Sequence, residues 1–122
     1  MRTQPSEIAM NIVHKEHSIG FDPLTGTLTI TGLLRRMSKD YEEICELLDH
    51  ILLLAPPRLI VDIRGLKMIN SSGLNTLSRF VLALRGKPGV GVTFHGSTEV
   101  VWHAKTLANM KHFLPAAQVV LR

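Results

Sequence analysis

The strongest constraint on the fold is a short apolar segment at the centre of the chain, followed after a loop by an amphipathic helix. Residues Leu59–Ile63 are Leu-Ile-Val-Asp-Ile, and an apolar, β-branched run of this length is typical of a strand buried on both faces. After the loop, apolar side chains recur at a spacing that places them on one face of a helix. These are Leu74, Leu77, Val81 and Leu84. A buried strand that leads into such a helix predicts an α/β domain.

This helix is predicted to begin at two adjacent serines, Ser71 and Ser72. Asn70 precedes them and is a favourable N-cap, because its side-chain oxygen can accept a hydrogen bond from an amide one turn further on. Ile69 and Leu74 have the spacing of a hydrophobic staple, which would set the angle at which the chain enters the helix. The two hydroxyls are therefore expected at the positive end of a helix dipole, where a phosphate is stabilised.

Two further helices are predicted on either side of the serine helix. The first has its N-cap at Ser38 and stops before Pro56-Pro57, because proline lacks an amide and excludes the helical conformation before it. The other has its N-cap at Ser97 and ends before Pro115, while Gly86 is expected to end the serine helix as a left-handed cap. The inward stripes are predicted to be Tyr41, Ile44, Cys45, Leu48, Ile51 and Leu52 in the first helix, and Val100, Val101, Ala104, Leu107 and Ala108 in the other.

Shorter apolar runs predict the remaining strands. Ser18–Asp22 and Thr27–Thr31 flank a Pro-to-Gly turn, and alternation of threonine with Leu and Ile predicts a hairpin. An edge strand is expected within Ile8–Glu16, and two more over Val90–Phe94 and Gln118–Leu121. Together these elements predict a single α/β domain with a mixed β-sheet, an N-terminal hairpin and about three helices on right-handed crossover connections.

Length and composition are those of one globular domain over residues 1–122, with residues 1–7 expected to be disordered or loosely held. The single cysteine, Cys45, allows no internal disulfide and favours a reducing, cytoplasmic location. The longest apolar run falls far short of a membrane span, and the N-terminus lacks the pattern of a secretory signal. We therefore expect no membrane insertion.

Charge and motifs disfavour several functional classes. The net charge of +4 comes from scattered Lys and Arg with few aromatics, so direct nucleic-acid binding is not expected. The histidines lack metal-ligand spacing, and Gly86–Gly91 lacks the Ser or Thr of a P-loop. The serine pair lacks the first glycine of a hydrolase nucleophile elbow. The sequence therefore predicts no metal, no cofactor and no enzymatic activity.

Residues Ile60–Ile63 and Met68–Leu77, which are Ile-Val-Asp-Ile and Met-Ile-Asn-Ser-Ser-Gly-Leu-Asn-Thr-Leu, resemble the signature of the STAS domain family (sulfate transporter and anti-sigma-factor antagonist). The order of elements is also similar, so the resemblance covers about Gly20 to Leu121. The most similar members in style are the free-standing anti-sigma-factor antagonists. The resemblance implies a STAS-like fold and a regulatory protein-binding module in a partner switch. The implied partner is an anti-sigma factor that is also a serine kinase, and a homodimer is compatible with this role.

The same resemblance assigns roles to the serine loop. It implies that Ser71 is the phosphoacceptor, with Ser72 as second choice, and that Leu74 is a buried anchor. Asn70 stands where the family usually has Asp, and because Asn caps a helix about as well, the fold is expected to be retained. The alternative reading is a STAS-like subunit that, without phosphorylation, binds a small anion or lipid or serves a membrane transporter ATPase.

The partner-binding residues are expected around the start of the serine helix. Gly73 costs a helix about 1 kcal/mol relative to alanine, so either close approach of a partner or close packing inside the fold must explain it. Arg64 and Lys67 are expected to add positive charge that complements an acidic partner. Trp102 is either a contact residue or packed inside the fold. The predicted partner-binding set is Asn70, Ser71, Ser72, Gly73, Asn75, Arg79, Leu82, Arg64 and Lys67.

Overall fold

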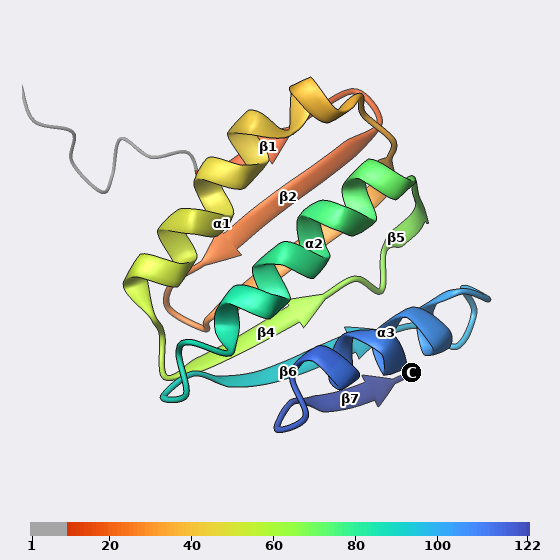
Figure 1. The fold of residues 1–122 in the computed structure, drawn as a ribbon. Helices are drawn as coiled ribbons and strands as arrows, with labels where there is room; N and C mark the ends of the chain where they lie inside the picture. Colours follow the sequence, from red (N-terminus) through yellow and green to blue (C-terminus); the bar gives the residue numbers. More distant parts are fainter. Residues whose placement is uncertain (1–9) are drawn as a thin grey trace, which may run out of the picture.

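A computed structural model describes residues 10–122, so the expectation for residues 1–7 lies outside the described residues. Three helices pack on a single twisted sheet (Figure 1). In chain order the elements are β1 (Asn11–Val13), β2 (His17–Asp22), β3 (Thr27–Leu34), a 3₁₀ turn (Ser38–Tyr41), α1 (Glu42–Leu54), β4 (Arg58–Asp62), β5 (Leu66–Ile69), α2 (Ser71–Leu84), β6 (Gly91–Gly96), α3 (His103–Phe113) and β7 (Gln118–Leu121).

The sheet is mixed, as the sequence predicts. Among the described residues it has seven strands in the order β1-β2-β3-β4-β6-β7, with β5 also paired to β3. The pairs β1–β2 and β2–β3 are antiparallel and form the predicted N-terminal hairpin and its edge strand. All other pairs are parallel. Within residues 10–122, no helix is both long and apolar enough to cross a lipid bilayer.

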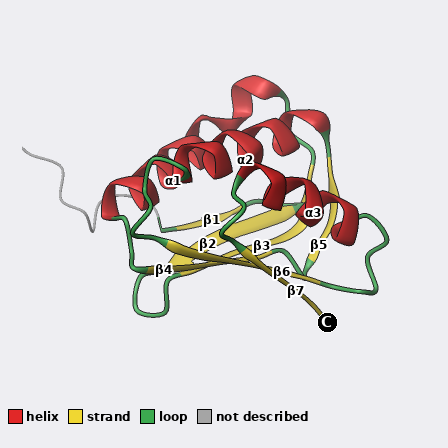
Figure 2. Cartoon of the chain, turned by 60° about the horizontal axis from the view of Figure 1, so that its bottom comes forward, coloured by secondary structure: helices red, strands yellow, loops and turns green. Residues whose placement is uncertain are grey.

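The helices cover only one face of the sheet (Figure 2). The central strand β4 therefore alternates, with Leu59 and Val61 buried and Ile60 and Asp62 only half-buried. The expectation that this strand is buried on both faces is wrong, because no helix crosses to the second face. Its isoleucine and valine content reflects strand propensity as well as burial.

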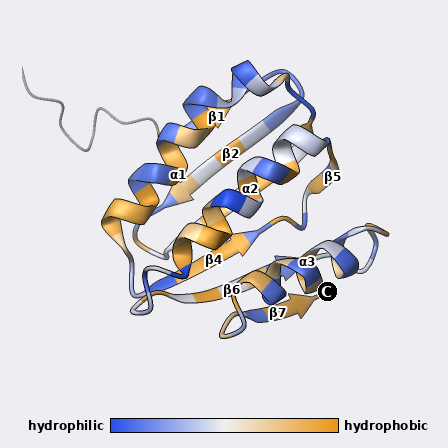
Figure 3. Ribbon diagram, in the orientation of Figure 1, coloured by the Kyte–Doolittle hydropathy of each residue, from blue (hydrophilic) through white to orange (hydrophobic). Residues whose placement is uncertain are grey.

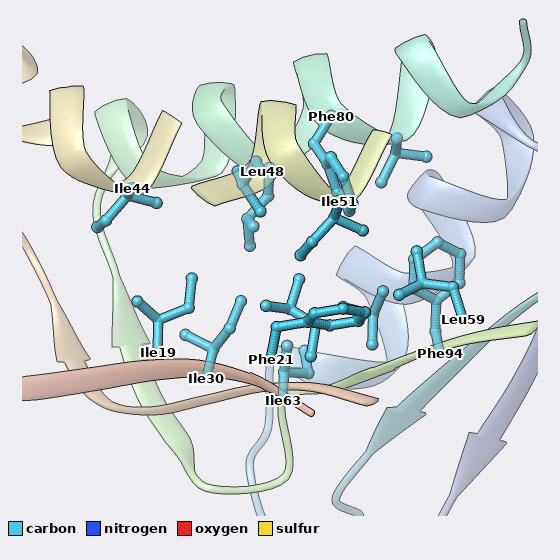
Figure 4. Close-up of a cluster of buried hydrophobic side chains, with 14 of the residues drawn as sticks. Ile19, Phe21, Ile30, Ile44, Leu48, Ile51, Leu59, Ile63, Phe80 and Phe94 are labelled. Atoms are coloured by element: carbon cyan, nitrogen blue, oxygen red, sulfur yellow. The ribbon is translucent and has the colours of Figure 1, made fainter. Parts of the chain in front are cut away.

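The core lies between the sheet and helices α1 and α2. Figure 4 shows side chains from both layers meeting there, among them Ile30 from β3, Ile51 from α1 and Phe80 from α2. Each fully buried aliphatic or aromatic side chain contributes about 1.5–3 kcal/mol relative to exposure. The buried faces of α1 and α2 differ in part from the predicted stripes. Leu47 and Phe80 are buried although the sequence analysis omitted them, and Leu74, expected as a buried anchor, is 36% exposed.

Strand β5 was expected to be part of a loop. This strand forms because β3 extends beyond the part that pairs with β4. Only Thr27–Thr29 of β3 pair with β4. The remaining part of β3 is free, and β5 takes that position with Leu66 opposite Gly32 and Ile69 opposite Leu34. The strand therefore delivers Asn70 to the start of α2 in extended conformation.

Helix α3 begins later than predicted. The Ser97 hydroxyl accepts the Glu99 amide at 3.1 Å, which closes a turn, and the α-helix starts only at His103. This delay rotates the buried stripe away from the predicted residues. Val101 is 95% exposed, and the predicted inward residues Ala104 and Ala108 are exposed as well. The residues that face the core are His103, Leu107 and Met110.

The predicted end of α1 is confirmed, whereas the predicted cap of α2 is not. Helix α1 ends at Leu54 before Pro56-Pro57, and Ala55 adopts the left-handed conformation with its amide bonded to the Ile51 carbonyl at 3.0 Å. Gly86 is not left-handed: among the described glycines only two have positive φ, and Gly86 is not one of them. The prediction of a left-handed Gly86 cap is therefore wrong.

Candidate partner-binding site at the start of helix α2

Asn70 holds the start of α2 through three side-chain hydrogen bonds. Its Oδ1 accepts from the Gly73 amide and from the Tyr41 hydroxyl, each at 2.9 Å. Its Nδ2 donates to the Arg36 carbonyl at 2.8 Å. The predicted N-cap is confirmed. An aspartate would keep both acceptor contacts but could not donate to a carbonyl, so an amide makes one more hydrogen bond here than a carboxylate would.

Tyr41 completes this polar network beneath the helix start. Its side chain is buried, and its hydroxyl donates to Asn70 while accepting the Arg36 amide at 3.2 Å. Burial raises the pKa of Tyr41, so the hydroxyl keeps the proton that it donates. The sequence analysis identified Tyr41 only as part of an apolar stripe, because its polar role depends on residues distant in the sequence.

Gly73 is explained by close packing inside the fold. A Cβ at this position would lie 2.8 Å from Tyr41 Oη and 2.9 Å from Ile69 Cγ1, closer than real side chains pack. Gly73 is also buried. Of the two explanations that the sequence leaves open for this glycine, close packing inside the fold is therefore the one that the structure shows.

Ser71 is the first residue of α2 and is exposed. Of the amides at this helix end, that of Gly73 bonds to the Asn70 side chain and that of Leu74 to the Asn70 carbonyl. The amides of Ser71 and Ser72 find no acceptor among residues 10–122. Two unpaired amides at the positive end of a helix dipole favour a negatively charged group beside Ser71.

Ser72 is half-buried, and its hydroxyl lies 3.0 Å from the Ser38 hydroxyl. Ser38 was predicted to be the N-cap of α1, but it begins the 3₁₀ turn and makes no side-chain cap hydrogen bond there. Instead it links the segment before α1 to the start of α2. Ser72 is therefore less accessible than Ser71.

A groove runs between α1 and α2, and we call it the α1–α2 groove. Its larger hollow, of about 660 Å³, begins beside Ser72. A second hollow of about 260 Å³ continues it towards the C-terminal ends of both helices, and Cys45 and Arg79 border both. The structure thus brings together four members of the predicted partner-binding set, namely Ser72, Asn75, Arg79 and Leu82.

The predicted positive charge before the serines is weaker than expected. Arg64 forms a two-pronged ion pair with Asp62, with Nη2 to Oδ2 at 2.7 Å and Nε to Oδ1 at 3.0 Å. Burial alone would raise the pKa of Asp62, but the hydrogen bonds and charge of Arg64 outweigh it and hold that pKa below its usual value. Lys67 is exposed, and neither cation borders the α1–α2 groove.

Trp102 makes contacts within the fold. Its indole N–H donates to the Lys67 carbonyl at 3.0 Å, and its ring packs edge-on against His103 with centroids 4.5 Å apart. The fully buried His103 bonds to the Leu66 carbonyl at 2.7 Å and accepts the Ser97 amide at 3.0 Å. Together the two side chains hold strand β5, which leads into the serine loop. The sequence analysis missed His103, since no local pattern marks it.

His14 and His17 form a second polar cluster near Arg36. The two rings stack with centroids 5.0 Å apart, and an Arg36 Nη1 contacts His14 Nε2. His17 is buried, its Nδ1 has no hydrogen-bond partner among the described residues, and burial lowers its pKa. Within residues 10–122, no three His, Cys, Asp or Glu side chains gather closely enough to hold a metal ion.

No protein-family model and no curated protein sequence matches this chain. Its structure is similar to that of SiaC in the crystal structure of the diguanylate cyclase SiaD in complex with its activator SiaC from Pseudomonas aeruginosa. The TM-score is 0.71 at 15% sequence identity, and the match covers 93% of this chain and 100% of that chain. At this identity the similarity shows the fold. The chain is a small single-domain α/β protein whose mixed sheet and three helices are consistent with a STAS-like fold.

Proposed function

We propose that this chain is a regulatory protein-binding module, similar to an anti-sigma-factor antagonist, whose partner binding is switched by phosphorylation of Ser71. In this role it is a binding protein and not an enzyme. One observation carries the proposal: the Ser71 hydroxyl is exposed at the start of α2, beside two amides that have no acceptor among residues 10–122. The network of Asn70 and Tyr41 beneath it is complete without Ser71.

The switch works through the surface rather than through the fold. A phosphate on Ser71 would be stabilised by the helix dipole by about 0.3–1 kcal/mol, so the domain stays folded. The same phosphate adds nearly two negative charges, and burying it unpaired against a partner costs several kcal/mol. Because about 1.4 kcal/mol changes an affinity tenfold, this cost lowers partner affinity by at least about 100-fold.

Phosphorylation is tested directly with a serine kinase of the anti-sigma-factor type. The protein is incubated with the kinase and ATP, and phosphate is mapped by mass spectrometry. We expect phosphate on Ser71, none in Ser71→Ala, and retained modification in Ser72→Ala, which removes only the contact with Ser38. Phosphate confined to Ser72, or no phosphate with a kinase that binds the protein, would contradict the proposal.

The second step of the proposal concerns binding. Ser71→Asp should retain the thermal unfolding midpoint of the unmodified protein, because the side chain is exposed and a carboxylate is favourable at a helix N-terminus. Its affinity for the kinase partner, measured by titration calorimetry, should fall by at least about tenfold. Asn109→Asp, at an exposed position on α3 outside the α1–α2 groove, is the control for added charge. Undiminished affinity of Ser71→Asp would refute the switch.

A second candidate partner is a diguanylate cyclase. The similarity to SiaC, described as the activator of the diguanylate cyclase SiaD, extends over that whole chain and favours this candidate. Cyclic dinucleotide synthesis by a candidate cyclase would then rise when this chain is added and fall again with the Ser71→Asp variant. An unchanged rate despite measurable binding would exclude activation.

A further inference from the structure

The turn between β1 and β2 holds the segment that runs from β3 to the 3₁₀ turn. The His14 amide closes this turn by donating to the His17 carbonyl at 2.8 Å. The Glu16 carbonyl accepts the Leu33 amide at 2.8 Å, and the Glu16 carboxylate pairs with the Arg35 guanidinium. The turn lies at the end of the sheet where α1 and α2 begin (Figure 1). The segment after β3 therefore has the β1–β2 turn on one side and the helix starts on the other.

Arg36 links this turn to the start of α2. Its guanidinium contacts the His14 ring, and its backbone contacts the polar network beneath Ser71. The Arg36 carbonyl accepts from Asn70 Nδ2 at 2.8 Å, and the Arg36 amide donates to Tyr41 Oη at 3.2 Å. Because the same Asn70 side chain caps α2, a displacement of Arg36 would act directly on that cap.

The contact between Arg36 and His14 requires a neutral imidazole. A guanidinium can only donate hydrogen bonds, so His14 Nε2 must be the acceptor and cannot carry a proton. An imidazolium donates from both nitrogens and is positively charged. Protonation of His14 would therefore turn this contact into a repulsion between two cations.

His17 places a second imidazole against His14. The two rings stack with centroids 5.0 Å apart and an angle of 13° between their planes. His17 is 6% exposed, and its Nδ1 has no hydrogen-bond partner among residues 10–122. No carboxylate in the described part of the chain is buried, so no such group could compensate a proton on this ring from inside the fold. The pair is therefore arranged for two neutral rings.

The surrounding charges do not reverse this preference. Figure 3 shows hydrophilic residues gathered where α1 begins, whereas the C-terminal ends of α1 and α2 are hydrophobic. Burial lowers the pKa of His17, the positive charges of His14 and Arg36 lower it further, and Glu16 offsets only part of this. Asp40 lies 4.0 Å from the Arg36 guanidinium. The charged side chains of the neighbouring elements are Lys15 and Glu16 in the turn, Arg35 and Arg36 after β3, Lys39 and Asp40 in the 3₁₀ turn, and Glu42 and Glu43 at the start of α1.

From these contacts we infer that the stacked pair of His14 and His17 is a proton-sensitive support of the Ser71 site. When the pair binds a proton, Arg36 loses its contact with His14, and the Asn70 cap at the start of α2 loosens. This inference rests on the proposed function, because it concerns the regulation of the same site. A partner that recognises the ordered helix start then binds less tightly at acidic pH, without any phosphate on Ser71.

The Gly73 amide reports on the cap, because it donates to Asn70 Oδ1 at 2.9 Å. Its hydrogen exchange is measured by NMR in the isolated protein, and the intrinsic rate at the same pH is divided by the measured rate to give a protection factor. Between about pH 7.5 and about pH 5.5, which spans the ordinary titration of histidine, this factor should fall by about fivefold. The Ala55 amide, bonded to the Ile51 carbonyl at the other end of α1, should change by less than about twofold.

His14 is exposed, so it can be replaced without disturbing the core. His14→Gln keeps an acceptor for Arg36 but does not titrate, so its Gly73 protection factor should be alike at the two pH values. His14→Lys carries a permanent charge and no acceptor, so Gly73 should already be weakly protected at the higher pH. His112→Gln, exposed on α3, is the matched control and should respond to pH as the unmodified protein does.

A Gly73 protection factor that does not change with pH in the unmodified protein would overturn the inference, even if Ser71 is phosphorylated. A full response in His14→Gln would also overturn it. Equal changes at Gly73 and Ala55 would do the same, because they indicate loosening of the whole fold. Conversely, a pH-dependent Gly73 amide together with an unmodifiable Ser71 would retain the histidine support and reject the phosphorylation switch. The two failures are therefore distinguishable.

Discussion

At the scale of single residues, the start of α2 depends on contacts that its own sequence does not contain. Asn70 bonds to Arg36 and Tyr41, which come from the segment between β3 and α1. Gly73 leaves the space that the Tyr41 hydroxyl occupies. The helix start that carries the exposed Ser71 is thus held by a segment distant in the chain. Tyr41, for example, lies 29 residues before Asn70.

Asn70→Asp is expected to destabilise the protein at neutral pH. The carboxylate cannot donate to the Arg36 carbonyl, and leaving that part-buried acceptor unpaired costs about 1–3 kcal/mol. The gain from a negative charge at the helix start is about 0.3–1 kcal/mol, so a net loss of about 1 kcal/mol remains. Urea unfolding measures this, with the exposed Asn75→Asp as control. Equal stability of Asn70→Asp and the parent would show that the Arg36 contact is unimportant.

Gly73→Ala is expected to lose stability despite the better helix propensity of alanine. The new Cβ would contact Tyr41 and Ile69 at under 3 Å, and overpacking of this kind costs about 1–3 kcal/mol. The propensity gain of about 1 kcal/mol offsets only part of it. Gly86→Ala is the matched control, because its nearest neighbour would be 3.5 Å away. Thermal unfolding should therefore show a lower midpoint for Gly73→Ala alone, and a higher one would contradict this packing.

At the scale of elements, strand β5 decides where the serine loop lies. It pairs with the end of β3 that β4 leaves free, and two of its carbonyls accept hydrogen bonds from Trp102, just before α3, and from His103, the first residue of α3. The turn closed by Ser97 shifts the start of α3 to His103 and brings this side chain inward. The serine loop is therefore supported from two sides, by the 3₁₀ turn before α1 and by the first turn of α3.

His103→Leu tests this support. The change leaves the Ser97 amide and the Leu66 carbonyl without their partner, and each unpaired buried group costs about 1–3 kcal/mol. We expect the free energy of unfolding to fall by about 2–4 kcal/mol. Relative to the parent protein, hydrogen exchange should accelerate more in β5 than in β2. His112→Leu, at an exposed position on the same helix, should change stability by less than about 0.5 kcal/mol. If hydrogen exchange in β5 were unchanged in His103→Leu, His103 would not support the strand that leads into the serine loop.

At the scale of the whole molecule, the helices lie on one side of the sheet (Figure 2), so Ser71 and the α1–α2 groove belong to the same layer. Helices α1 and α2 lie side by side over the sheet (Figure 1), and residues of both helices line the groove between them. A partner can therefore bind to the helical layer without disturbing the buried residues. In the proposed switch, this separation would allow a charge on Ser71 to control binding while the fold remains intact.

Global stability should depend on pH through His17. Its folded-state pKa lies below the ordinary value of 6.5, so the unfolded chain binds the proton more tightly. The contribution of the neutral ring is present above about pH 6.5 and is lost as pH falls through the folded-state pKa. His14 and Arg36, which lie beside it, add to this effect. Urea unfolding between about pH 7 and pH 5 should show a flatter profile for His17→Leu than for His112→Leu, and identical profiles would exclude His17.

The sequence alone determined the class of fold, the hairpin and the N-cap at Asn70. These follow from local periodicity, capping and turn chemistry, which act over a few neighbouring residues. Only the tertiary structure decided that β5 is a strand, that Gly73 is buried beneath Tyr41, and that Asp62 neutralises Arg64. The first two depend on segments distant in the chain, and the third on the local geometry at the end of β4. Periodicity and spacing do not encode which side chains these contacts bring together.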